Sequence, residues 1–345
     1  MKEKGIKVMQ PQVTKKMMKP FHEDCEYFWS PSVRWEQQDD EIRIELLSYS
    51  GTVSGLFPTF YYLTQKGIKI PDLISRFPQA NPDQVADFVR DLIANRILVH
   101  TLLTPQEIYF PQEHLISHSY SSETFLDPAQ YEAFRQEKLS RSLPQTTQTN
   151  VPLAESEFPE VITARRTWRQ FEEKKKVPFD VFSSLISVFK QYRREDEIRY
   201  NYATAGGLYP IDLYVYIKDH RVENMKAGLY YYNPIENVLQ MVSNTCVITE
   251  DAHYSMNKEI FQSSAFSIYL IYNADVTMPK YGGLGYFYAG IDSGIMVQLL
   301  THVAEMHKAG ICSIGDMNFR RIQKYFKLSP QQVLIHSIEV GLQPQ

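Results

Sequence analysis

The sequence predicts an α+β protein built in two parts, and three observations support that fold class. Short segments of alternating apolar and polar residues, mixed with brief helical stretches, fill the first hundred residues. In the second half, a tyrosine-rich hairpin and one near-continuous apolar strand indicate a buried sheet. A long apolar helix follows that strand. We therefore expect a small module followed by a larger domain of sheet and helices.

Composition narrows the function classes. The chain has 345 residues, enough for two domains, with 43% hydrophobic and 22% charged residues. A net charge of -4 gives no reason to expect nucleic acid or a membrane as partner. Cys25, Cys246 and Cys312 lie far apart, so the spacing predicts neither a disulfide framework nor a metal site. Without a signal peptide or a 20-residue apolar run, we expect a cytoplasmic protein.

The first 104 residues predict a winged-helix-like domain. Val33, Trp35 and Ile42 alternate with polar residues, which indicates a β-hairpin or a pair of edge strands. Asn81 followed by proline predicts a helix start. The helices are expected over residues 58–66, 70–77 and 82–95, with a returning strand over 97–103. The third helix is acidic, which disfavours DNA binding and leaves peptide or protein docking, or a structural role.

Residues 105–158 differ in composition from the segments before and after them. They are polar and rich in serine and threonine, so we expect a linker that contains one helix, over about 128–140. From residue 159 onward the sequence predicts the larger domain.

Two clusters in this domain suit an anionic, flat ligand. Arg165, Arg166 and Arg169 flank Thr167, and arginine donates in pairs to phosphate, although a solvated basic helix end would have the same composition. A helix over 178–192 follows. The Thr204–Gly207 loop lets backbone N–H groups approach a ligand. It precedes the strand 213–217 and is not a GxGxxG motif, which disfavours a Rossmann nicotinamide site; an ordinary turn is the alternative.

The stretch from Met278 to Gly294 carries the candidate chemistry. Lys280 and Tyr281 are both usable proton-transfer groups and stand beside a flexible glycine segment. The alternative is a glycine loop with a solvated lysine. Further elements are expected as a hairpin turning at Asn233-Pro234, a central strand over 266–272, helices over 291–308 and 320–327, and a last strand over 336–340.

Four motifs in order give the second half a resemblance to a known family. They are RRTWRQF, ATAGGLYP, GLYYYNP and PKYGGLGYFYAGIDSG. Residues 160–341 resemble the nitroreductase-like FMN oxidoreductases, and specifically the SagB-type dehydrogenases that oxidise azolines to azoles. The resemblance implies a nitroreductase-like FMN-binding domain over 159–345, a central, mostly antiparallel sheet flanked by helices. Ala203-Thr204 depart from the family's usual Pro-Ser, although Thr204 keeps the hydroxyl.

The resemblance also implies a cofactor, a partner and a set of site residues. The family forms homodimers with FMN between the subunits. One group would hold the FMN phosphate and the ring edge: Arg165, Arg166, Thr167 and Arg169. A second would line the ribityl chain and the ring: Thr204, Ala205, Gly206 and Gly207. A third would approach the flavin with backbone groups: Ser313, Ile314 and Gly315.

The implied reaction removes a proton and a hydride from a thiazoline or oxazoline ring. The hydride would go to flavin N5, the proton to Lys280 or Tyr281, and oxygen would reoxidise the flavin. A free amine (pKa about 10.4) or phenol (pKa about 10) is a poor base at pH 7, so burial or a neighbouring charge has to assist. The sequence leaves open which of the two residues takes the proton.

The expected substrate is a thiazoline-containing peptide intermediate on a nonribosomal synthetase carrier domain. The first 104 residues look like the winged-helix region of azole-forming oxidases, which in ribosomal pathways holds a leader peptide, so leader-peptide delivery is an alternative. Two further alternatives are an NAD(P)H-dependent nitro- or quinone reductase of the same fold and a flavin-free binding module.

Overall fold

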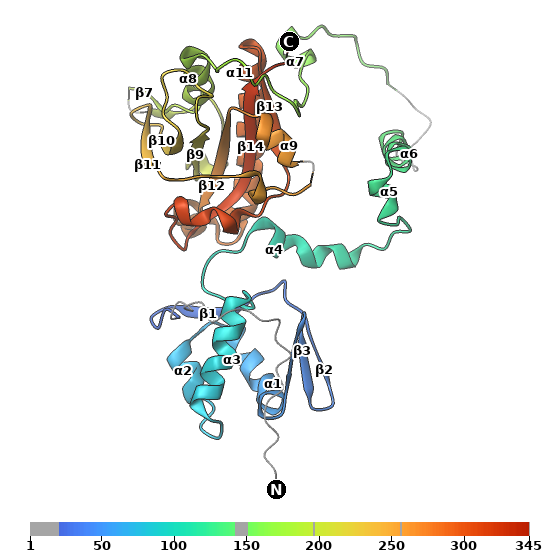
Figure 1. The fold of residues 1–345 in the computed structure, drawn as a ribbon, viewed down its shortest axis with the longest axis vertical. Coiled ribbons are helices and arrows are strands. Elements are labelled where there is room, and N and C mark those ends of the chain that lie inside the picture. The colour runs from blue at the N-terminus through green and yellow to red at the C-terminus, as the bar shows by residue number, and fades with distance from the viewer. Residues whose placement is uncertain (1–20, 142–150, 196, 256, 345) are drawn as a thin grey trace.

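The computed structural model describes residues 21–141, 151–195, 197–255 and 257–344 (Figure 1). The N-terminal part contains two small sheets and three helices. One sheet has the strand order β5-β1-β6 and the other β2-β3-β4. The elements are β1 Glu26–Trp29, β2 Trp35–Gln38, β3 Glu41–Ile44, β4 Leu47–Ser50, α1 Thr52–Thr64, β5 Ile68–Lys69, α2 Ile70–Ser75, α3 Pro82–Ala94 and β6 Leu98–Val99.

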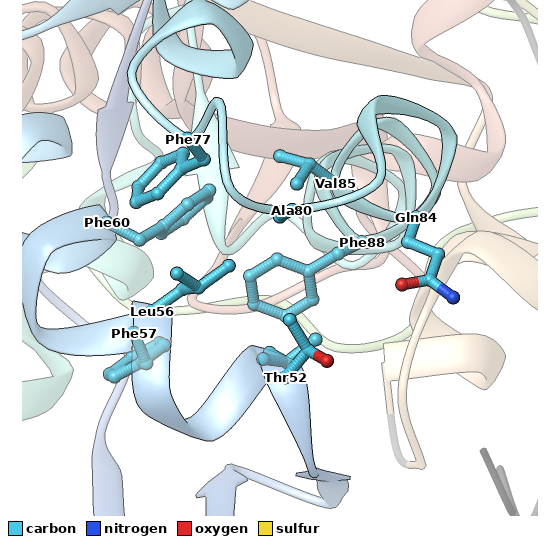
Figure 2. Close-up of a pocket in the computed structure, with 10 residues that line it drawn as sticks. Thr52, Leu56, Phe57, Phe60, Phe77, Ala80, Gln84, Val85 and Phe88 are labelled. Carbon is cyan, nitrogen blue, oxygen red and sulfur yellow. The ribbon is translucent and has the colours of Figure 1, made fainter. Parts of the chain in front are cut away.

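These N-terminal elements share one apolar core. Phe57 and Phe60 of α1 pack with Val89 and Leu92 of α3. The space left between the two helices is a cavity of about 20 Å³, room for one water molecule (Figure 2). Its lining residues are apolar except for Thr52 and Gln84, so we treat it as part of the core.

Several sequence predictions for this part need correction. The expected hairpin over 30–50 has a third strand, β4. Helix α1 begins at Thr52 and contains Pro58, because residues 53, 56, 57 and 60 pack at helical spacing. Strand β6 covers only Leu98–Val99, since the backbone of Leu102 bonds to Pro330 instead. The Asn81 cap is confirmed: its side chain accepts from the N–H of Asp83. The winged-helix-like assignment stays a prediction.

Residues 104–141 form a segment whose first six residues lie against both parts of the protein and whose remainder extends away as a thin arm (Figure 1). Its helical segments are α4 Pro105–Tyr109, a 3₁₀ turn Phe110–Leu115, α5 Glu123–Leu126 and α6 Pro128–Leu139. The predicted helix is thus confirmed in α6, which the Asp127 side chain caps by accepting from the N–H of Gln130. Residues 142–150 of the expected linker lie outside the described residues.

Within the described residues, six strands of the second half form one sheet with the order β11-β10-β9-β12-β14-β13. Every neighbouring pair is antiparallel, as the sequence led us to expect. Strand β12 lies inside the sheet, which explains its near-continuous apolar sequence. The strands are β9 Ile211–Ile217, β10 Gly228–Asn233, β11 Val238–Ser243, β12 Phe266–Asn273, β13 Ala309–Ile314 and β14 Gln332–Leu342, with a separate hairpin of β7 Tyr192–Arg194 and β8 Glu197–Arg199.

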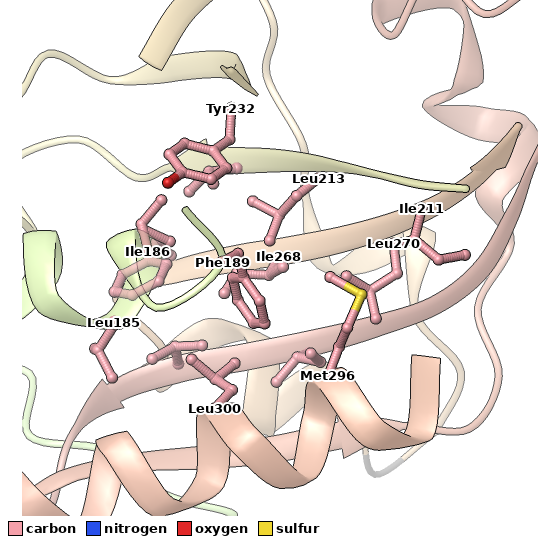
Figure 3. Packing of buried hydrophobic residues seen from close by; sticks show 14 of the residues in the cluster. Leu185, Ile186, Phe189, Ile211, Leu213, Tyr232, Ile268, Leu270, Met296 and Leu300 are labelled. Carbon is pink, nitrogen blue, oxygen red and sulfur yellow. The ribbon is translucent and has the colours of Figure 1, made fainter. Parts of the chain in front are cut away.

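Helices and turns cover both faces of this sheet. Leu213 and Leu270 face α8 and the central helix α11, whose Leu300 and Met296 point back at the strands (Figure 3). Tyr269 and Ile271 of β12 face the opposite way, into a second apolar cluster. The remaining elements are α7 Glu160–Thr163, α8 Phe179–Ser187, α9 Asn257–Ser263, α10 Ala274–Tyr281, α11 Leu284–Met306 and 3₁₀ turns at Ala205–Gly207, Glu250–Ala252, Phe319–Arg321 and Gln323–Tyr325.

Three predictions for the second half are wrong in detail. The helix expected over 320–327 is two 3₁₀ turns, and the helix expected over 178–192 ends at Ser187. The long helix begins at Leu284 and not near Ile291. Its first glycine is packed against α10: a Cβ on Gly285 would lie 3.0 Å from Thr277 Oγ1.

Candidate functional site

Lys280 and Tyr281 lie in the last turn of α10 and not in a glycine loop. The sequence suggested a loop because two adjacent glycines, Gly282 and Gly283, follow the pair directly. Here Asn273 caps the start of α10 by accepting from the N–H of Asp275 at 3.3 Å, and Gly282 ends it with φ 57°. The pair therefore has a fixed helical backbone and follows directly from the central strand β12.

The head groups of this pair converge on Gly206. A Cβ on Gly206 would lie 2.9 Å from Lys280 Nζ and closer still to the Tyr281 hydroxyl. Gly206 has φ 67°, a conformation that favours glycine. The Tyr281 ring meets Tyr288 of α11 edge to face at 5.3 Å. Two segments that are more than 70 residues apart in sequence thus place an amine and a phenol over one exposed backbone loop.

The Thr204–Gly207 loop is held at both ends. Thr204 Oγ1 accepts from the N–H of Tyr209 at 3.0 Å, and the Tyr209 ring stacks on Tyr200 with centroids 3.7 Å apart. The Thr204 hydroxyl therefore has a structural partner already. Gly207 also has a positive φ, 66°, but an added Cβ there would meet nothing within 4 Å.

Asp292 of α11 is a site residue that the sequence reasoning missed. Its Oδ1 accepts from the N–H of Ala205 at 3.2 Å, while Oδ2 is buried and without a partner among the described residues. The side chain is 3% exposed, and burial raises the pKa of its carboxyl although the Ala205 bond acts in the opposite direction. The sequence pattern could have identified Asp292: it shares the buried face of the helix with Ala289 and Met296, and a carboxylate is rarely buried on such a face.

We call Gly206, Lys280, Tyr281 and Asp292, with the loop from Thr204 to Gly207, the loop cluster. A hollow of about 210 Å³ opens beside it. Ala203, Thr204 and Ala205 form one wall, and Tyr288, Ile291, Asp292 and Ile295 of α11 form the other. The unpartnered carboxylate oxygen thus belongs to a residue that lines an open space next to the candidate proton acceptors.

The segment with Arg165, Arg166 and Arg169 lies away from the loop cluster, beside strand β13. The N–H of Trp168 bonds to the carbonyl of Ile311 at 3.1 Å, and a Cβ on Gly310 would lie 2.8 Å from the Trp168 side chain. The Arg166 guanidinium stacks on the Trp168 ring at 3.5 Å. Arg165, Arg166, Thr167 and Arg169 are all exposed, and among the described residues these arginines form no ion pair with a carboxylate.

Ser313, Ile314 and Gly315 belong to the same place as the arginines. They are at the end of β13, the strand that receives the Trp168 bond, and Ser313 and Gly315 are exposed while Ile314 is buried. Burial raises the pKa of the neighbouring Cys312 thiol, and the charge of Arg169 partly opposes this rise. We call Arg165, Arg166, Thr167, Arg169 and residues 313–315 the arginine cluster.

The loop cluster and the arginine cluster are separate within one chain. Along α11, Asp292 gives the position of the loop cluster. Glu305 gives the position of the arginine cluster, because its carboxylate accepts from Trp168 Nε1 at 3.4 Å. Thirteen residues at 1.5 Å per residue put them roughly 20 Å apart along the helix. The structure brings each predicted group together but does not join the two groups into one site.

Beside the loop cluster, the N-terminal half of α11 carries an exposed apolar stripe. Leu284, Phe287, Ile291 and Ile295 lie on one side of the helix and are all exposed. Ile291 and Ile295 also line the hollow at the loop cluster. An apolar stripe at this position is typical of a surface that a second chain covers.

The residues present fit FMN, which pairs a phosphate with a flat ring. Exposed guanidinium groups are good phosphate donors, and the arginine cluster supplies three. At the loop cluster, the missing Cβ of Gly206 lets Lys280 and Tyr281 approach the loop backbone, and the hollow beside them has room for part of a flat ring. The described residues contain no helix long and apolar enough to cross a membrane, and no group of three candidate metal ligands.

Comparison with known proteins agrees with this picture. A sequence model of the nitroreductase family matches residues 162–342, slightly more than half of the chain. A protein of Methanocaldococcus jannaschii with a provisional nitroreductase name is 22% identical over 184 residues, which cover 53% of this chain and 90% of the relative.

One solved structure is similar in fold over most of the chain. The chain is similar to one in the Escherichia coli microcin synthetase McbBCD complex with truncated pro-MccB17 bound, with a TM-score of 0.52 and 16% identity over 81% of this chain and 98% of the other. A Staphylococcus epidermidis protein with a provisional NAD(P)H:FMN oxidoreductase name has a TM-score of 0.38 and 13% identity, covering 54% and 86% of the two chains. The first likeness must extend into the residues before 159, since the residues after it make up only a little over half of the chain.

Proposed function

We propose that this chain, which belongs to the nitroreductase family and is a flavin-dependent oxidoreductase with FMN as its cofactor, oxidises a thiazoline or oxazoline ring of a peptide to the azole. The convergence of Lys280 and Tyr281 on Gly206 carries the proposal. Removing two hydrogens from an azoline requires a base at a fixed position, and an amine and a phenol that share one loop provide it. When bound, FMN supplies the hydride acceptor and passes the electrons on to oxygen.

The chain's own residues move the proton. As the ring C–H bond breaks, its proton goes to the Tyr281 oxygen or to Lys280 Nζ. Lys280 Nζ lies 4.9 Å from the centre of the Tyr281 ring, so the two candidate proton acceptors stand side by side. Gly206 keeps the space beneath both groups free of side-chain atoms.

We further propose that the working unit is a homodimer that places the arginine cluster of one copy beside the loop cluster of the other. The separation of roughly 20 Å along α11 and the exposed stripe beside the loop cluster support this arrangement. Arg165, Arg166 and Arg169, with Thr167, would hold the phosphate. Thr204–Gly207 and Ser313–Gly315 would offer backbone groups to the ring and ribityl chain.

The substrate in this proposal is a peptide intermediate, delivered on a nonribosomal carrier domain. The fold likeness to a synthetase complex solved with a bound pro-peptide supports a peptide substrate. We assign residues 1–104 to the winged-helix-like domain, 105–158 to the linker and 159–345 to the FMN domain, and we place the protein in the cytoplasm.

The test is the double variant Lys280→Ala/Tyr281→Phe. Azole formation from a thiazoline-bearing peptide, followed by mass spectrometry as the loss of two hydrogens, should fall by roughly 10³-fold or more, because a general base contributes 10²–10⁴-fold. The purified variant should remain yellow with bound FMN, since neither residue is assigned to cofactor binding. Undiminished turnover in the double variant would refute the assignment.

The runner-up is an NAD(P)H-dependent nitro- or quinone reductase, which the family match alone fits equally well. Consumption of NAD(P)H with a small nitroaromatic, with no conversion of azolines, would favour it. In that reaction Lys280→Ala/Tyr281→Phe should matter little, because hydride transfer to a nitro group needs no base on the loop.

A further inference from the structure

A second hollow, of about 570 Å³, lies between the N-terminal part and the FMN domain. Both parts contribute to its walls, and it is the size of a small-ligand pocket. Its lining residues come from β1, from the segment that leads into α4, and from the α10–α11 corner. The aromatic residues among them are Phe28, Trp29, Tyr109, Tyr286 and Phe287.

Direct contacts between the two parts hold the walls in place. The Tyr286 hydroxyl donates to the carbonyl of Leu103 at 2.8 Å, and the N–H of Leu102 donates to the carbonyl of Pro330 at 3.2 Å. All four residues line the hollow. The space is therefore formed before any ligand enters it.

A charged clamp reinforces this junction. The Glu107 carboxylate accepts from Arg96 Nε at 2.6 Å and from Arg320 of the FMN domain at 2.8 Å. Burial alone would raise the pKa of Glu107, but the Arg96 and Thr104 hydrogen bonds and both arginine charges lower it to about 2. The clamp stays charged at neutral pH, and it fixes α4, which carries Tyr109.

The lining selects for an uncharged, flat group. None of the residues that line the hollow is an acid, a lysine or an arginine, and burial lowers the pKa of His100, which is therefore neutral at pH 7. Phe28, Tyr109 and Phe287 are 41%, 50% and 53% exposed, so part of each ring is open to a ligand in the hollow. Aromatic walls around an empty space favour stacking with a ring.

The hollow is adjacent to the candidate base pair. Met278 and Gly283 both line it, and they stand two residues before Lys280 and two residues after Tyr281. Two residues span at most roughly 7 Å of chain. A group in the hollow and a ring at Lys280 and Tyr281 can therefore belong to neighbouring residues of one peptide.

We propose that this hollow binds an uncharged aromatic side chain or ring that directly neighbours the reacting azoline in the substrate peptide. The inference rests on the proposed function and adds to it the class of residue beside the reacting ring. It also gives the N-terminal part a role, because Phe28, Trp29 and His100 contribute walls that the FMN domain lacks.

The test compares two synthetic N-acetyl aminoacyl-thiazoline substrates, one with phenylalanine beside the ring and one with glycine. The full-length enzyme should prefer the phenylalanine substrate by about tenfold in kcat/KM, mainly through KM, because burying part of an aromatic ring is worth about that factor. Phe28→Ala and Tyr109→Ala should each reduce the preference to about threefold or less.

Tyr62→Ala is the matched control, since Tyr62 is an exposed aromatic residue of the same N-terminal part, 63% exposed, and does not line the hollow. It should keep the wild-type preference. Equal kcat/KM for the two substrates in the wild type, or equal loss of preference in Tyr62→Ala and Phe28→Ala, would overturn the proposal.

A binding measurement separates this inference from the oxidase activity itself. Calorimetry with the corresponding thiazole peptides, which cannot be oxidised further, should show tighter binding of the phenylalanine peptide to the wild type and loss of that difference in Phe28→Ala. An enzyme that turns over both thiazolines but binds both thiazoles equally refutes the hollow alone. An enzyme that oxidises neither thiazoline refutes the proposed function.

Discussion

The loop cluster and the arginine cluster hold their functional groups in opposite ways. At the loop cluster, Lys280 and Tyr281 are fixed by a capped helix, by the contact with Gly206 and by an edge-to-face ring contact. At the arginine cluster, the neighbouring Trp168 is anchored through Ile311 and Glu305, but the guanidinium groups around it stay exposed. One cluster depends on shape, and the other on charge.

This difference indicates which part of the chemistry each cluster can serve. Charge attracts a phosphate over several ångströms and tolerates small displacements. Proton transfer requires hydrogen-bond distance and therefore a fixed backbone. We expect single substitutions to cause loss of activity at the loop cluster and gradual loss of cofactor affinity at the arginine cluster.

The largest effect should follow from dissociating the proposed dimer, which would part the arginine cluster of one copy from the loop cluster of the other. Ile291→Asp puts a charge in the middle of the exposed α11 stripe and should convert a dimer into monomers, because burying an unpaired charge costs several kcal/mol. FMN and activity should be lost together if each site needs both copies. Light scattering and the flavin absorption of the purified protein measure the two outcomes.

Ile235→Asp serves as control, since Ile235 is exposed at the β10–β11 turn and away from the stripe. It should remain dimeric and yellow. A monomeric Ile291→Asp protein that retains FMN at wild-type affinity would show that one chain alone suffices.

Gly206→Ala should reduce turnover by about 100-fold or more. The added methyl group would overlap the Tyr281 hydroxyl and lie within 2.9 Å of Lys280 Nζ, so both groups must move. Gly207→Ala is a close control: its φ is 66° against 67° for Gly206, so the backbone strain of about 1 kcal/mol is shared, but the methyl group meets nothing. Equal kcat for the two variants would show that strain, and not the position of Lys280 and Tyr281, matters.

Much of the fold follows from local sequence patterns. The Asn81 cap, the α6 helix, the hairpin turning at Asn233 and the interior strand β12 lie where the sequence predicts them, because each depends on a few neighbouring residues. The start of α11 could not be predicted, since the close packing of Gly285 against Thr277 of α10 appears only in three dimensions.

The candidate site was harder to predict than the fold. Sequence and resemblance together named Lys280, Tyr281 and the loop, but their meeting at Gly206 depends on long-range packing between α10 and the 3₁₀ turn before β9. Asp292 was missed because an acid in an otherwise apolar helix is normally placed on the solvent side. The separation of the arginine cluster from the loop cluster also appears only in three dimensions.

Arg165→Ala tests the charge-dependent cluster. Losing one charge-assisted contact to a phosphate should weaken FMN binding by about 10- to 100-fold, with kcat at saturating FMN nearly unchanged. The affinity should also fall with added salt. Arg43→Ala is the control, because Arg43 is exposed and paired only with Glu36 in the N-terminal part. Unchanged FMN affinity in Arg165→Ala would remove that residue from the phosphate site.

The smallest expected change, in stability, comes from Asp292→Asn, and its sign is informative. Burial raises the pKa of Asp292 in the folded state, so the folded protein holds the proton more tightly than the unfolded chain, whose Asp pKa is about 3.9. Stability is therefore lost as the pH rises from about 4 through the raised pKa, and an asparagine side chain does not titrate. The oxygen of the new amide can still accept from the Ala205 N–H. The variant should melt about 2–4 °C higher at pH 7–8, as about 1 kcal/mol gives, and the gain should shrink toward pH 4.

The same substitution sharpens the contrast between the clusters when activity is measured beside stability. A buried, destabilising carboxylate whose second oxygen has no partner among the described residues is worth retaining only if a ligand uses it. We therefore expect Asp292→Asn to lose more than tenfold in kcat/KM while it gains stability, whereas Asp219→Asn, at an exposed acid, should change neither. A stabilised Asp292→Asn enzyme with wild-type kcat/KM would mean that Asp292 only positions the Thr204–Gly207 loop, and that this cluster depends on backbone shape alone.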